Sequence, residues 1–183
     1  MSTEKLGLWQ KIRRGVWITL GSVGVIIGAI FATQPPTIPP PIPVVQVAER
    51  SWIATNDFTD SVTVSGVTYT VTIRKGFKTD YASIPVKLQP ELGLSNDSPC
   101  LRRGAYLHDG LFSLMDCNGQ GGPVSMETAN LILYTAILKD GCVQAKADAI
   151  LAMVNAWGPF AVLRHTPESV RVARGFVQAQ HSP

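Results

Sequence analysis

The feature that most constrains this chain is a long segment without charge. No Asp, Glu, Lys or Arg occurs from Gly15 to Ala48. Within it, residues 15–32 (GVWITLGSVGVIIGAIFA) form an apolar run of 18 residues, close to the roughly 20 that a helix needs to cross a bilayer. Its glycines are compatible with this, because glycine is common in membrane helices. The run therefore predicts a transmembrane helix that acts as an uncleaved signal anchor.

The charges around this span predict its orientation. Four of the 16 basic residues and one of the 13 acidic residues precede it, so twelve of each follow. A basic flank stays on the cytoplasmic side, so residues 1–14 are predicted to be a cytoplasmic tail and the rest extracytoplasmic. We expect a single-pass protein of the inner membrane or of a virion membrane, with lipid as one partner. The neutral outer part gives no reason to expect nucleic-acid binding.

Two alternatives to the anchor remain. A cleaved signal peptide would be cut after Ala32, but Ile30 would then occupy a position that prefers a small residue. A buried helix of a soluble protein fits poorly with the proline tract TQPPTIPPPIP at residues 33–43. That tract favours an extended polyproline II spacer of roughly 30 Å. We therefore assign residues 33–45 to a proline-rich spacer and residues 46–183 to an extracytoplasmic domain.

The outer domain is predicted to be α+β, with a small antiparallel sheet and about four helices. Residues 61–73 alternate between apolar and polar side chains around Ser65-Gly66, which predicts a two-residue hairpin. Helical patterns cover residues 100–116, a helix capped by Ser125 and ending at Lys139, residues 144–157 ending at Gly158-Pro159, and a helix opened by Thr166-Pro167-Glu168. Of three cysteines, Cys100, Cys117 and Cys142, two could form one disulfide and leave one thiol.

The candidate chemistry lies in AYLHDGLF, residues 105–112, where a His-Asp pair interrupts an apolar run. Helical spacing turns His108 toward the core and leaves Asp109 at the edge of that face. A buried histidine needs partners for its ring nitrogens. Asp80 could orient it as a base, and with Asp109 the three side chains could also hold a divalent metal. The alternative is a core histidine with satisfied nitrogens and an Asp80 that caps a turn.

Asn130 is a second polar side chain predicted to face inward. It occupies the apolar stripe of its helix together with Met126, Leu133 and Ile137. An unpaired buried amide costs roughly 1–3 kcal/mol, so we expect Asp80, His108, Asp109 and Asn130 to share one polar cluster. That cluster could be either an active site or a structural network. The glycine-rich loop DCNGQGGP at residues 116–123 lacks the features of phosphate or calcium loops, and Cys117 is the weaker alternative as a nucleophile.

GFKTDYASIP (residues 76–85) and AYLHDGLF together resemble the phage and bacterial family called domain of unknown function 1353, over about residues 60–158. The resemblance assigns polar roles to Thr79, Asp80, Ser83, His108 and Asp109. Tyr81, next to Asp80, is a further candidate for the surroundings of the site. A later aspartate of the family pattern corresponds to Asn130 here, and an amide is a poorer metal ligand and no base. The resemblance implies a phage or prophage origin but no reaction.

Two functions from different classes follow. The first is a membrane-anchored envelope protein with a hydrolase-like site of His108, Asp80 and Asp109, acting on peptidoglycan, with Thr79, Tyr81, Ser83 and Asn130 around them. The second is non-enzymatic: a virion membrane component, a lysis accessory or a superinfection-exclusion factor that contacts phage or host envelope proteins. In that case the polar cluster only stabilises the fold.

Overall fold

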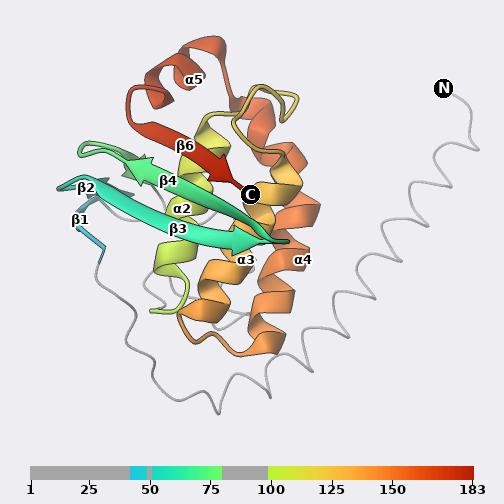
Figure 1. The fold of residues 1–183 in the computed structure, drawn as a ribbon. Helices are drawn as coiled ribbons and strands as arrows, with labels where there is room; N and C mark the ends of the chain where they lie inside the picture. Colours follow the sequence, from blue (N-terminus) through green and yellow to red (C-terminus); the bar gives the residue numbers. More distant parts are fainter. Residues whose placement is uncertain (1–41, 49–50, 80–98) are drawn as a thin grey trace, which may run out of the picture.

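The described part of the chain is an α+β structure, as the sequence predicted. The computed structural model describes residues 42–48, 51–79 and 99–183. Figure 1 shows a sheet lying across a layer of helices. The strands are β3 (Phe58–Val64), β4 (Val67–Ile73) and β6 (Val177–Ser182), and the helices beneath are α2 (Arg102–Ser113), α3 (Met126–Lys139) and α4 (Gln144–Ala161).

Two three-stranded antiparallel sheets are formed. The larger has the order β3-β4-β6, and the smaller has the order β1-β2-β5, with β1 at Val44–Ala48, β2 at Ser51–Ala54 and β5 at Lys78–Thr79. The hairpin of β3 and β4 is confirmed. Ser65 and Gly66 both have positive φ, 51° and 84°, which is the geometry of the two-residue turns that match strand twist.

Four strands went unrecognised in the sequence: β1, β2, β5 and β6. β1 contains Val44 and Val45, which the sequence interpretation placed in the spacer. All six residues of β6 pair with β4, from Val177↔Ile73 to Ser182↔Thr68. The segment alternates, with Val177 buried and Gln178 exposed, but it is short and polar, and its pairing partner lies about a hundred residues earlier. Its strand character therefore depends on a non-local contact.

Helix α3 begins as predicted, with the Ser125 side chain accepting the backbone N–H of Thr128. The packing of α2 against α3 depends on Gly104, because a Cβ there would lie 2.6 Å from Ile137 Cγ2 and 2.9 Å from the Leu133 carbonyl oxygen. This close approach brings the polar residues of the two helices within reach of each other.

The end predicted for α4 is wrong. The helix continues through Gly158 and Pro159 to Ala161, followed by a 3-10 turn, η2 (Val162–Arg164). Proline at this position removes one backbone hydrogen bond, but Val154, Gly158 and Val162 are all buried at a spacing of four. Burial of that stripe therefore outweighs the local preference to stop. The last helix, α5 (Pro167–Ala173), has the predicted Thr166 cap, with Ser169 completing a capping box.

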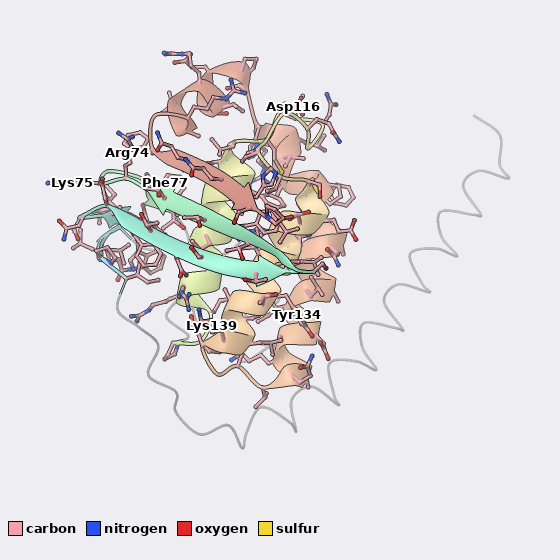
Figure 2. All side chains as sticks on the ribbon, in the orientation of Figure 1. Arg74, Lys75, Phe77, Asp116, Tyr134 and Lys139 are labelled. Atoms are coloured by element: carbon pink, nitrogen blue, oxygen red, sulfur yellow. A yellow bond between two sulfur atoms is a disulfide. The ribbon has the colours of Figure 1, made fainter. Side chains whose placement is uncertain are left out.

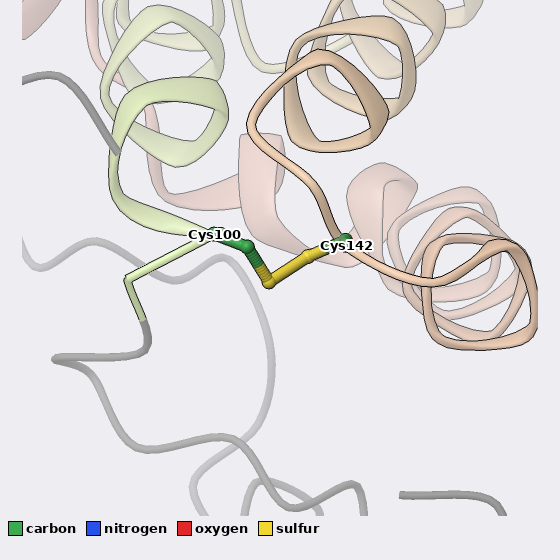
Figure 3. Close-up of a disulfide and its surroundings, with 2 residues drawn as sticks. All are labelled: Cys100 and Cys142. Carbon is green, nitrogen blue, oxygen red and sulfur yellow. A yellow bond between two sulfur atoms is a disulfide. The ribbon is translucent and has the colours of Figure 1, made fainter. Parts of the chain in front are cut away.

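Cys100 and Cys142 form a disulfide, and Cys117 is a free, exposed cysteine. Figure 3 shows that the bond joins the segment before α2 to the connection between α3 and α4. The two cysteines are 42 residues apart in sequence. The bond therefore closes a long loop that contains α2 and α3, the two helices that carry the candidate site.

Loss of this disulfide is expected to lower the free energy of unfolding by about 2–4 kcal/mol, because the bond restricts the unfolded chain. The double variant Cys100→Ser/Cys142→Ser should show this loss in urea denaturation followed by circular dichroism. Cys117→Ser is the matched control and should unfold like the wild type. Equal midpoints for the double variant and the control would contradict the prediction.

No helix of the described residues is long and apolar enough to cross a bilayer. The predicted span, residues 15–32, lies outside the described part of the chain, as do the tail before it and residues 33–41 of the predicted spacer.

Candidate functional site

The predicted inward orientation of His108 is confirmed. Its side chain lies on α2 and the residue is 1% exposed. The ring packs against Phe112 one turn later, with 4.1 Å between ring centroids and an interplanar angle of 31°. One face of the imidazole therefore lies against the Phe112 ring, and this packing restricts the orientation of the imidazole independently of its hydrogen bonds.

Asn130 fixes one ring nitrogen of His108. The distance from His108 Nε2 to Asn130 Oδ1 is 2.8 Å, and Asn130 Nδ2 donates to Asn155 Oδ1 at 2.7 Å. A carbonyl oxygen only accepts, so Nε2 must carry the hydrogen. In the neutral ring, Nδ1 then has the free lone pair. These two hydrogen bonds, which link Asn155 of α4 to Asn130 of α3 and Asn130 to His108 of α2, thus select the tautomer of the histidine.

Asp109 lies on the other side of the ring. Its Oδ1 is 3.8 Å from His108 Nδ1, which is too long for a hydrogen bond but close enough for a charge interaction when the ring is protonated. Its Oδ2 accepts a hydrogen bond from the hydroxyl of Thr79. The Asp109 side chain is 11% exposed, whereas the His108 side chain is 2% exposed.

Thr79 is positioned by strand pairing and by aromatic packing. As part of β5 it pairs with Trp52 of β2. Two residues earlier, Phe77 packs edge-on against Tyr106 of α2, with 5.9 Å between centroids. Tyr106 is fully buried, and that burial raises the pKa of its phenol above the usual value. The segment ending in Thr79 is therefore held against the helix that carries Asp109.

The structure brings together four of the predicted site residues: Thr79, His108, Asp109 and Asn130. Asp80, Tyr81 and Ser83 lie outside the described residues, so their predicted roles stay predictions. Asn155 was missed. It is an exposed polar residue on a helix, and nothing in the local sequence distinguishes it from any other solvent-facing amide.

No group of three or more His, Cys, Asp or Glu side chains in the described ranges is arranged to hold a metal ion. The predicted ligand set includes Asp80, which lies beyond those ranges. Among the described residues, His108 Nδ1 and Asp109 could supply one nitrogen and one carboxylate from the same side of α2. This pair suits a divalent ion only if further oxygen ligands come from elsewhere.

A second buried polar group, also missed, lies at the start of α2. Arg103 donates from Nη1 to Asp140 Oδ1 at 2.9 Å and from Nε to Asp60 Oδ2. Burial raises the pKa of Asp140, and Arg103 opposes that rise. For Arg103, burial acts to lower the pKa, but its hydrogen bonds with Asp60 and Asp140 outweigh burial and raise it. This ion network joins β3 to the start of α2 and to the end of α3, and so links the two helices that carry His108 and Asn130.

Cys117 and His165 line a common pocket of about 250 Å³ near α5. The imidazole Nδ1 of His165 is 2.8 Å from the carbonyl oxygen of Met115. Cys117 is exposed. This pocket is separate from the His108 cluster, so His108 does not activate the thiol.

Comparison with known proteins identifies one family. The model of the family described as Protein of unknown function (DUF1353) matches residues 57–154, in agreement with the resemblance seen in the sequence. The match includes Thr79, His108, Asp109 and Asn130. No curated protein and no solved structure matches the chain.

Proposed function

The chain belongs to the DUF1353 family, which has no assigned reaction, and from the geometry of its polar cluster we propose a hydrolase-like site on a membrane-anchored envelope protein. The observation that carries the proposal is the hydrogen bond from His108 Nε2 to Asn130 Oδ1. It leaves Nδ1 as the basic nitrogen and directs it toward the side where Asp109 lies. A hydrogen bond that fixes the tautomer of a histidine and leaves the other ring nitrogen basic suits a general base.

The chemistry follows from these atoms. Nδ1 of His108 takes a proton from a water molecule as the water oxygen attacks an amide carbonyl, and the Asp109 carboxylate at 3.8 Å stabilises the imidazolium that forms. The same proton then passes to the departing amine as the C–N bond breaks. Thr79 keeps the carboxylate in place by donating to its other oxygen, and Asp80 is proposed as a further carboxylate beside the ring.

Peptidoglycan is the proposed substrate, because a domain anchored to the bacterial inner membrane faces it directly. The uncharged segment at residues 15–32 and the basic residues before it support that anchor. The adjoining proline tract supports a stiff spacer that would keep the domain close to the bilayer. A phage origin, suggested by the family resemblance, is consistent with action on the cell envelope.

A non-enzymatic role is the second candidate, and one observation favours it. His108 is almost fully buried against Phe112 and already has a partner at Nε2. A histidine in that position could serve only to satisfy Asn130 and to order the packing of α2 on α3. The chain would then act as a structural or interaction protein of the virion or host envelope.

Digestion of purified peptidoglycan separates the two candidates. Full-length protein in mild detergent is expected to release soluble fragments with new amino groups. Asp109→Asn should slow release by about 10- to 100-fold, since a loss of 1.4–2.8 kcal/mol of stabilisation corresponds to that factor. The asparagine can still accept the Thr79 hydroxyl, so the fold should be retained.

Asp148→Asn is the matched control, because that carboxylate lies on α4 and bonds to Tyr134 and Gln144. It should digest like the wild type. Sensitivity to a chelator would assign His108 and Asp109 to metal binding. Absence of release by folded wild-type protein, with and without added divalent metal, would remove hydrolysis and leave the non-enzymatic role.

A further inference from the structure

Three large apolar side chains are exposed together at the end of α4. Trp157, Phe160 and Leu163 are 42%, 61% and 65% exposed, and the first two rings lie 5.7 Å apart. Their spacing of three places them side by side along α4 and η2. We call these residues the α4 apolar patch. Contiguous exposed apolar side chains mark surfaces that a membrane, a partner protein or a ligand covers.

The patch continues into a pocket of about 800 Å³. Met126, Pro159, Val162 and Leu163 contribute its apolar lining, and residues 117–123 of the glycine-rich loop, with Val124 and Ser125, form the other wall. Asp116, the first residue of this loop, is labelled in Figure 2 and lies at the same end of the molecule as α5. The apolar surface therefore extends beyond the three side chains of the α4 apolar patch. The loop that borders it includes the polar residues Asn118, Gln120 and Ser125.

An arginine adjoins the patch. Arg164 follows Leu163 directly and is exposed. Within the described ranges it forms no ion pair, whereas Arg171 is held by Glu168 at 2.6 and 2.8 Å. Tryptophan, phenylalanine and leucine flanked by arginine match the boundary of a phospholipid bilayer, where aromatic rings sit at headgroup depth and guanidinium groups meet lipid phosphates.

We propose that the α4 apolar patch inserts into the headgroup region of the phospholipid bilayer to which the chain is anchored. This inference rests on the membrane attachment in the proposed function. The eleven residues 33–43, if extended as a polyproline II spacer, would cover roughly 30 Å at about 3.1 Å per residue. The domain is then confined near the lipid surface, and this high local concentration favours contact by a patch too small to bind lipid stably from solution. Contact would fix the orientation of the domain on the membrane.

The test uses full-length protein reconstituted into phospholipid vesicles that contain lipids with a quencher on the acyl chain. A fluorophore is attached at Ala156→Cys in a Cys117→Ser background, because Ala156 is exposed one turn before Phe160 and leaves the patch intact. The matched control carries the fluorophore at Gln180→Cys, on the exposed face of β6. We expect at least twofold quenching at position 156 and none at position 180.

Phe160→Ser/Leu163→Ser in the Ala156→Cys background should abolish the quenching. Equal quenching at positions 156 and 180, no quenching at 156, or quenching that survives the double substitution would overturn the inference. So would a signal at 156 that depends on protein concentration rather than on the lipid quencher, which would indicate a second copy on the patch. Vesicle flotation tests the membrane attachment separately. Protein that floats with the vesicles but shows no quenching at position 156 refutes only the contact of the patch with lipid. Protein that does not float refutes both the membrane attachment and the contact of the patch.

Discussion

Replacement of Arg103 by methionine is expected to lower the free energy of unfolding by about 3–5 kcal/mol, the largest effect of any single substitution considered for this chain. The guanidinium is the shared partner of Asp60 and Asp140, whose side chains are 16% and 1% exposed. Removing it leaves two carboxylates with little access to water. Methionine keeps most of the side-chain volume, so the loss reports the uncompensated charges. Urea denaturation at neutral pH measures it.

The surface pair of Arg171 and Glu168 provides the control. Both side chains are well exposed, at 74% and 66%, and exposed ion pairs contribute little to stability. Arg171→Met should therefore unfold at nearly the wild-type midpoint. Equal losses for the two variants would show that the buried network contributes no more than a surface pair, contrary to the prediction.

The Arg103→Met variant should also acquire a pH dependence. Burial already raises the pKa of Asp140 in the folded protein, and Arg103 is the main group that lowers it. Without the arginine that pKa rises further above its value in the unfolded chain. The folded variant then binds protons more tightly than the unfolded variant, so the deficit is greatest at neutral pH and shrinks as pH falls through the raised pKa.

The second large effect is expected at His108. His108→Gln should reduce peptidoglycan digestion by about 10²- to 10⁴-fold, the usual contribution of a general base. The glutamine amide can still donate to Asn130 Oδ1, which now accepts from His108 Nε2, so the network to Asn155 can persist. What is lost is the basic Nδ1 that faces Asp109.

His181→Gln is the matched control, because that histidine is exposed on β6. It should digest like the wild type. Circular dichroism should show both variants to be folded. If His108→Gln digests as fast as the control, the ring has no part in proton transfer and the structural role for the cluster would stand.

The sequence predicted best where short-range chemistry decides the structure. Ser65-Gly66 predicted the hairpin, Ser125 and Thr166 predicted helix starts, and helical periodicity turned both His108 and Asn130 inward. Two inward polar groups on helices that pack together must pair or lose hydrogen bonds. Their contact was therefore predictable without a structure.

The missed features all depend on contacts between distant segments. Asp60 and Asp140 meet Arg103 across separations of 43 and 37 residues, and a chain with many other acids offers no way to select them. Three cysteines allow three pairings, and only the fold selects Cys100 with Cys142. Asn155 became a site residue because α4 packs on α3. In each case the local sequence allows several partners, and the partner that is formed depends on the tertiary structure.

The most direct test of the central claim is the tautomer of His108. Full-length protein labelled with ¹⁵N-histidine would be examined by ¹⁵N–¹H correlation spectroscopy at a pH where the ring is neutral, with His108→Gln to assign the resonance. We expect a hydrogen on Nε2 and an unprotonated Nδ1, since Asn130 Oδ1 can only accept. A His108 ring with its hydrogen on Nδ1 would mean that the basic nitrogen faces Asn130, and it would contradict the proposed site.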